Sequence, residues 1–129
     1  MKNILFLLFA LALFAGCNKI ETSKLNSYPD TEFITLSDLH YYDTTLGTTG
    51  SAFQTYLNND RKLLAESPEI ISAISEKVIL SDAKFIIISG DLTKDGEKSS
   101  HLKVAQILKK IENSGKKVYI INGNHDILN

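Results

Sequence analysis

Residues 85–91 read FIIISGD, four apolar residues followed at once by a polar turn. Two similar runs flank this stretch, because residues 33–38 read FITLSD and residues 118–124 read VYIINGN. Each run is short, nearly continuous and rich in β-branched or aromatic side chains, which is typical of strands buried on both faces of a sheet. The sequence therefore predicts three strands, and each of them leads into polar residues.

A helix is predicted between the first two strands. Ser67 is suited to cap its start, with Pro68 at the first helical position. One apolar face follows at helical spacing and consists of Ile70, Ile71, Ile74 and Val78. The segment 41–60 is rich in Thr, Gly and Asn and shows no sustained period, so we expect a long loop there, with room for a short helix over 53–57.

A second helix is predicted over residues 97–113, and Gly115 supplies its C-terminal stop. Its inward face is predicted to consist of Leu102, Ala105, Leu108 and Ile111. Strands that alternate with helices indicate an α/β fold, in which a layered, mostly parallel sheet carries flanking helices.

The overall composition limits the possible functions. The chain has 129 residues, and 14 Lys and Arg residues nearly balance 15 Asp and Glu residues. Binding to a nucleic-acid backbone needs clustered positive charge, so nothing here implies a nucleic-acid partner. Cys17 is the one cysteine, which excludes an internal disulfide.

The N-terminus has the pattern of an export signal. Lys2 precedes the apolar run 4–15, which at about 12 residues is shorter than the roughly 20 needed to cross a bilayer. The small pair Ala15-Gly16 then leads into Cys17, which resembles the lipobox of bacterial lipoproteins. That resemblance implies lipidation at Cys17 and a membrane anchor in the cell envelope, outside the cytoplasm. An ordinary signal peptide, or a buried apolar helix with an incidental cysteine, is the alternative.

The chain therefore divides into three predicted parts. Residues 1–16 form the signal peptide, residues 17–30 form the lipidated cysteine with a polar tether, and residues 31–129 form the folded domain.

Residues that can bind metal ions follow each predicted strand. Asp38 and His40 follow the first, Asp91 the second, and Asn124 and His125 the third. Because the carboxyl ends of parallel strands meet at one edge of a sheet, these side chains are expected to converge. Asp and Asn are also common as helix caps and turn residues, but their placement after three consecutive strands, beside two histidines, favours a site.

Carboxylate, imidazole and amide ligands without a thiolate favour Mn, Fe or Zn over Ca. Two such ions need a bridging anion between them, and Asp91 lies centrally in the set. A pair of ions about 3.5–4 Å apart can polarise a phosphoryl oxygen and activate water near neutral pH.

The order of the three motifs resembles the calcineurin-like metallophosphoesterase superfamily. The motifs are Asp38-x-His40, Gly90-Asp91-x4-Gly96 and Gly123-Asn124-His125-Asp126. The resemblance implies that the domain is the N-terminal half of that fold. It further implies that Asp38 and His40 bind the first metal ion, Asp91 bridges and Asn124 binds the second. His125 would then protonate or stabilise the leaving oxygen, and Asp126 would orient the His125 ring.

Two departures from the superfamily pattern refine this interpretation. Protein Ser/Thr phosphatases carry Gly-Asp-x-Val-Asp-Arg-Gly at the second motif, whereas residues 90–96 read GDLTKDG. By position, the acid that pairs with the catalytic His and the phosphate-binding Arg are both missing, so the chain does not resemble a protein phosphatase. The chain is in this respect more similar to the branch of cyclic-nucleotide phosphodiesterases and other small-ester hydrolases. The superfamily also completes its site with a later His and a Gly-His-x-His block, neither of which follows Asp126 before Asn129. The 129 residues are thus expected to be an N-terminal fragment with little two-metal activity alone.

The predicted function is metal-dependent hydrolysis of a small phosphate ester. The alternative is a non-catalytic surface lipoprotein that keeps part of the fold as a binding module. Three further features have simpler explanations than a role in the site. His101 is expected to be structural or exposed, Arg61 and Lys62 to lie on a solvated face, and Tyr41 and Tyr42 to pack against the loop or line a substrate pocket.

Overall fold

The computed structural model describes residues 28–127. The predicted signal peptide, the lipidation at Cys17 and most of the tether lie outside these residues, so those predictions stay predictions. The elements, in chain order, are β1 (Phe33–Ser37), η1 (Thr44–Leu46), α2 (Ser51–Asn59), α3 (Ser67–Leu80), β2 (Phe85–Ser89), α4 (Lys98–Asn113), β3 (Lys117–Ile121) and η2 (Asn124–Asp126). In the described part of the chain, every helix is too short or too polar to span a bilayer.

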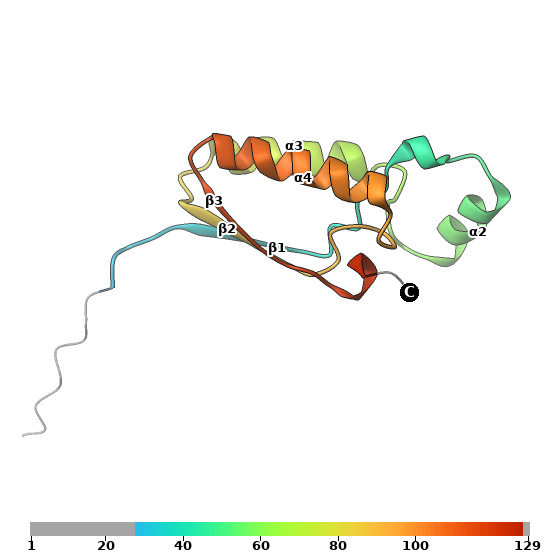
Figure 1. The fold of residues 1–129 in the computed structure, drawn as a ribbon, viewed down its shortest axis with the longest axis horizontal. Helices are drawn as coiled ribbons and strands as arrows, with labels where there is room; N and C mark the ends of the chain where they lie inside the picture. The colour runs from blue at the N-terminus through green and yellow to red at the C-terminus, as the bar shows by residue number, and fades with distance from the viewer. Residues whose placement is uncertain (1–27, 128–129) are drawn as a thin grey trace, which may run out of the picture.

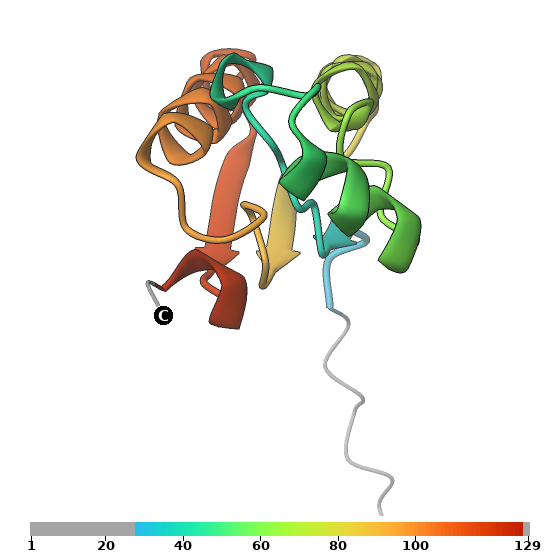
Figure 2. The ribbon, with the colours of Figure 1, turned by 90° about the vertical axis from the view of Figure 1, so that its right-hand side faces the viewer.

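The three strands form one parallel sheet in the order β1-β2-β3, which confirms the predicted α/β fold. Ile86 of β2 pairs with Ile34 of β1 and with Val118 of β3. The helices that connect the strands, α3 and α4, both cover the same face of the sheet (Figures 1 and 2). All three strands therefore end at the same edge, which is where η2 and the segments after β1 and β2 lie.

The core lies between the sheet and the two long helices. Ile86 and Ile88 of β2 are fully buried, and they pack with Ile71 of α3 and with Val104 and Ile111 of α4. The predicted inward face of α3 holds for Ile71 and Val78, whereas Ile70 is 39% exposed. The central strand is thereby fixed by apolar burial, which gives the polar segment after it a rigid base.

The buried face of α4 agrees with the predicted one at Ile111, which is buried, and at Leu108, which packs against the core, but differs nearer the start of the helix. Leu102 is 56% exposed and Ala105 is exposed, while Val104 is buried. The inward face of α4 consists of Ser100, Val104 and Ile111. The Ser100 hydroxyl accepts a hydrogen bond from the Asp43 backbone N–H. This buried polar contact, which sequence periodicity cannot reveal, selects the face that α4 turns inward.

The start of α3 also differs, because Glu66 is the N-cap and Ser67 is the first helical residue. The Ser67 hydroxyl is buried, donates to the Leu64 carbonyl and accepts from the Tyr42 backbone N–H. Ser67 therefore fixes the segment that follows β1 instead of capping the helix.

The outer face of the sheet is not covered by residues 28–127. The ring of Phe85 stacks on Phe33 at 5.1 Å and meets Tyr119 edge-on at 5.9 Å, yet Phe33 and Tyr119 are about half exposed. The prediction that the strands are buried on both faces is thus wrong for this part of the chain. Continuous apolar runs indicate burial without showing which residues provide it.

Candidate metal centre

Backbone hydrogen bonds carry the sheet pairing beyond the ends of the strands. The Asp38 N–H donates to the Gly90 carbonyl at 3.3 Å, and the His40 N–H donates to the Asp91 carbonyl at 2.9 Å. On the other side, the Gly90 N–H donates to the Ile121 carbonyl at 2.8 Å. The segments that carry the predicted ligands are therefore positioned by the sheet itself, as Figure 2 shows at the edge beside η2.

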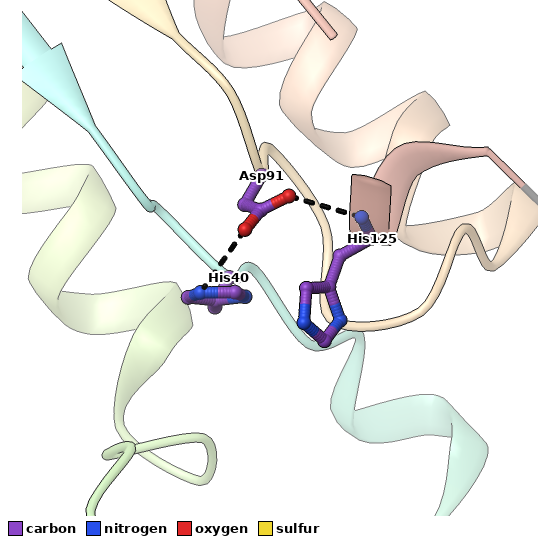
Figure 3. A group of neighbouring side chains, drawn as sticks. All are labelled: His40, Asp91 and His125. Carbon is purple, nitrogen blue, oxygen red and sulfur yellow. Dashed lines mark hydrogen bonds and ion pairs between the residues drawn. The ribbon is translucent and has the colours of Figure 1, made fainter. Parts of the chain in front are cut away.

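Three side chains from the three motifs converge at this edge (Figure 3). His40, Asp91 and His125 each offer one ligand atom, and these atoms lie within 4.8 Å of one another. Asp91 is central, because its Oδ2 is 3.8 Å from His40 Nε2 and its Oδ1 accepts the His125 backbone N–H at 3.0 Å. Asp38 lies beside this group, with its Oδ1 3.9 Å from His40 Nε2.

This arrangement fits a bound cation. The distances of 3.8 and 3.9 Å from His40 Nε2 to the two carboxylates are too long for hydrogen bonds. Burial and the charge of Lys62 lower the pKa of His40, and they outweigh the opposing effects of Asp91 and Asp38. A ring held neutral beside carboxylate oxygens is the form that binds metal, and a cation among these atoms would offset their mutual repulsion.

The backbone at the predicted ligands is strained. In residues 28–127, the non-glycine residues with positive φ are Asp38 at 54°, His40 at 42° and Asp91 at 43°. This left-handed conformation is unfavourable for residues with a side chain, and such strain collects at functional sites, where it is part of the mechanism. All three positions are predicted metal ligands. The strain therefore lies at the residues whose side chains the site has to orient, and the surrounding fold compensates for it.

This strain leads to a prediction for Asp38, whose side chain is 64% exposed. Asp38→Gly should not lower the free energy of unfolding, and should raise it by up to about 1 kcal/mol, because glycine adopts positive φ without strain. The same variant should weaken metal binding. Urea unfolding in the presence of a chelator and titration with Mn²⁺ measure the two effects.

Asp82→Gly is the matched control, because Asp82 is exposed, is not among the residues with positive φ and lies at the opposite edge of the sheet. There, glycine should lower the free energy of unfolding by about 0.5–1 kcal/mol. Equal destabilisation by the two variants would show that the conformation of Asp38 stores no strain.

Two glycines allow the motifs to approach each other. Gly90 has φ of 81° and turns the chain out of β2. At Gly123, an added Cβ would overlap the carboxylate and the backbone nitrogen of Asp91. The glycine of the third motif is therefore required because the side chain of Asp91 occupies the space beside it.

The ring of His125 is held by residues of the second motif. Its Nδ1 lies 2.5 Å from the Lys94 carbonyl oxygen and 3.0 Å from Asp95 Oδ1. Two acceptors at one nitrogen require Nδ1 to carry the proton. The sequence predicted that Asp126 orients this ring, but in the structure Asp95 takes that place.

Asp126 instead holds the second motif in place through hydrogen bonds. Its carboxylate is buried and accepts hydrogen bonds from the backbone N–H groups of Leu92, Thr93 and Gly123 at 2.8–3.0 Å, and from the Thr93 hydroxyl at 3.0 Å. Burial alone would raise the pKa of Asp126, but these hydrogen bonds outweigh it and lower the pKa. Asp126 thus ties the third motif to the second at the point where Asp91 leaves the sheet.

The remaining predicted residues lie around this group. Asn124 begins η2 and is exposed, and its role as a ligand stays a prediction. Lys62 was expected on a solvated face, but it lines a cavity of about 230 Å³ together with Asp38 and His40. His101 is structural, as expected, since its Nε2 is 3.2 Å from the Asp126 carbonyl oxygen.

Sequence reasoning missed Asp95 as a partner of His125. The available signal was an acid within the glycine-bounded block 90–96, one residue beyond the position that the protein phosphatases use. Position alone implied that the pairing acid was lost, whereas the local backbone brings the next residue, Asp95, to the ring.

Comparison with known proteins agrees with this geometry. A family model described as calcineurin-like phosphoesterase matches residues 32–129, which is most of the chain and includes all three motifs. A search of curated proteins finds no match. Since the family match spans more than half of the chain, the chain belongs to the calcineurin-like phosphoesterase family, whose members hydrolyse phosphate esters with the help of metal ions.

Proposed function

We propose that this chain carries a two-metal centre for the hydrolysis of small phosphate esters. The observation that supports this most strongly is the convergence of His40, Asp91 and His125 within 4.8 Å at the carboxyl edge of a parallel sheet. Carboxylates and a neutral imidazole suit a Mn, Fe or Zn ion, and the strained backbone at Asp38, His40 and Asp91 marks these positions as functional.

The chain's own residues have distinct proposed tasks. Asp38 and His40 would hold the first ion, Asp91 would serve both ions, and Asn124 would hold the second. Such ions, when bound, polarise a phosphoryl oxygen and make water more acidic. Asp91 also keeps the third motif close, because its Oδ1 accepts the backbone N–H of His125.

His125 is the proposed proton donor to the leaving oxygen. Its Nδ1 is fixed by the Lys94 carbonyl and Asp95, so Nε2 is the nitrogen that holds and releases a proton. The Asp95 carboxylate compensates the positive charge of the ring while both nitrogens are protonated. Asp95 is therefore a positioning residue, and its own pKa is lowered because Lys94 and His125 outweigh the effect of burial.

The number of ligands predicts how activity depends on metal concentration. Three described side chains serve the first ion, but only Asp91 and Asn124 serve the second. With Mn²⁺ and bis-p-nitrophenyl phosphate, we expect slow hydrolysis that continues to rise at Mn²⁺ concentrations well above those that fill the first site. Steady-state rates measured together with Mn²⁺ binding test this, and a chelator should abolish the reaction.

Three outcomes separate the alternatives. Hydrolysis that persists in the chelator would contradict the metal-dependent mechanism. If the rate of hydrolysis reaches its maximum when one Mn²⁺ is bound per chain, the proposal of a second ion is wrong. Metal binding without hydrolysis at any Mn²⁺ concentration would replace the proposed enzyme by a binding module.

A further inference from the structure

A cavity of about 480 Å³ lies between the segment after β1 and helix α2. We call it the aromatic cavity, because the rings of Tyr42, Phe53 and Tyr56 line it together with Lys94. Its volume is in the range of sites that bind small organic molecules. It contains none of the predicted metal ligands, and the proposed hydrolysis assigns it no task.

The lining of this cavity presents ring faces more than polar atoms. The hydroxyl of Tyr42 donates to the Gly47 carbonyl and that of Tyr56 donates to Asp60 Oδ2, both at 2.7 Å. The Phe53 ring lies against Tyr42 with centroids 5.0 Å apart. Because the two hydroxyls are already bonded to the protein, the cavity offers flat apolar surfaces that suit stacking.

Lys94 adds a cation whose place is fixed. Its Nζ lies 4.0 Å above the centre of the Tyr56 ring, and it pairs with Asp95. The Lys94 side chain is only 12% exposed. The positive charge is therefore compensated within the protein, so the cavity selects for shape and aromatic character more than for negative charge.

The aromatic cavity is connected to the candidate metal centre through two short segments. The Lys94 carbonyl accepts from His125 Nδ1, and Tyr42 is two residues after His40. The two segments are joined by hydrogen bonds of 3.0 Å from the Tyr41 N–H to the Leu92 carbonyl and 3.1 Å from the Lys94 N–H to the Tyr41 carbonyl. Lys94 therefore lines the cavity with its side chain and contacts the His125 ring with its carbonyl, so the two sites share this residue.

We propose that the aromatic cavity binds the flat aromatic group of the phosphate ester, a nucleobase or an aryl ring, and so makes this chain selective for aromatic organic phosphates. The proposal rests on the proposed function for the position of the phosphoryl group. Stacking on the rings that line the cavity supplies the preference for a flat group, and stacking tolerates different flat rings.

The probes are phenyl phosphate and methyl phosphate, titrated into the full chain with Mn²⁺ and measured by titration calorimetry. Phenyl phosphate should bind roughly 5- to 140-fold more tightly, since one stacked ring contributes about 1–3 kcal/mol. Phe53→Ala should reduce this ratio to near one. Phe33→Ala is the matched control, because Phe33 lies on the outer face of the sheet, and the ratio should stay as in the wild type.

A second variant covers the case in which Phe53→Ala does not fold. Ala52 is exposed and lines the cavity, so Ala52→Trp should fill the cavity without disturbing the core and should also bring the ratio to near one. Equal affinity of the wild type for the two phosphates, or an unchanged ratio in Ala52→Trp, would contradict the proposal that the aromatic cavity binds the ring of the ester.

A different measurement shows whether the proposed metal-dependent function is wrong while the cavity proposal is right. If methyl phosphate binds equally well with Mn²⁺ and with a chelator, the metal centre is not the phosphoryl site. Phenyl phosphate in the chelator still tests the cavity, because its binding should shift the NMR signals of Phe53 and Tyr56. The absence of such shifts at millimolar phenyl phosphate would overturn the cavity proposal by itself.

Discussion

Replacing Asp126 with asparagine should lower the free energy of unfolding by about 3 kcal/mol, because it leaves buried backbone donors without an acceptor. One carboxylate oxygen accepts the N–H groups of Leu92 and Gly123, and the other accepts the N–H and hydroxyl of Thr93. An asparagine amide group must face one of these pairs with its own N–H groups. Either orientation opposes donors to donors.

The loss of unfolding free energy caused by Asp126→Asn should decrease as the pH is lowered. The pKa of Asp126 is lowered in the folded chain because its hydrogen bonds outweigh burial, so its contribution is complete above the unfolded pKa. The contribution is lost as pH falls through the folded pKa. The difference between wild type and Asp126→Asn in urea unfolding should therefore be large at neutral pH and shrink in acid.

Asp82→Asn is the control for this experiment, since Asp82 is exposed and far from the third motif in the sheet. It should change stability by less than about 0.5 kcal/mol. A neutral-pH difference for Asp126→Asn as small as that of the control would mean that the carboxylate does not brace the second motif.

Replacing Asp91 with asparagine should weaken binding of the first metal ion by at least roughly 100-fold, because even residues that only support a ligand affect affinity by about 10–100-fold. The variant removes the charge at the centre of the group, where Asp91 faces His40 at 3.8 Å. An amide oxygen can still accept the His125 N–H, so the local fold should survive. Titration calorimetry with Mn²⁺ measures the change.

The comparison for Asp91 is Asp82→Asn, which removes an exposed acid that precedes β2 and lies outside the group of three. Its effect on Mn²⁺ affinity should be small, because a distant exposed charge is screened by solvent and salt. Unchanged Mn²⁺ affinity in Asp91→Asn, with the wild-type circular dichroism spectrum, would remove Asp91 from the metal centre.

The strands and the convergence of the motifs were predictable from sequence for a physical reason. A β-branched run such as 85–88 is stable only when buried, and parallel strands bring their carboxyl ends to one edge. The structure extends each predicted strand by one residue. Short-range patterns of this kind need no knowledge of contacts between distant segments.

The rotation of α4 and the hydrogen-bond partners within the site could not be predicted, because they depend on contacts between segments that are distant in the sequence. Val104 is buried in place of Leu102 because Ser100 bonds the backbone at Asp43 and sets the rotation of α4. Asp95 takes the task that was predicted for Asp126, because the turn after β2 decides which carboxylate reaches the His125 ring. The sequence gives the types of residue in the site but not which hydrogen bonds they make.

The left-handed backbone at the predicted ligands was also beyond sequence reasoning. Asp38, His40 and Asp91 adopt positive φ although glycine is the residue that favours it. Such a conformation persists only because surrounding pairings hold it, among them the hydrogen bond from His40 N–H to the Asp91 carbonyl. The strain became visible only with the backbone geometry.

The most direct test is the anomalous scattering from crystals of this chain grown with Mn²⁺. An ion should appear among His40, Asp38 and Asp91, within bonding distance of a nitrogen or oxygen atom of each side chain. Anomalous density only elsewhere on the chain, or a crystal in which the His40 and Asp91 side chains point away from each other, would contradict the metal centre on which the proposed hydrolysis depends.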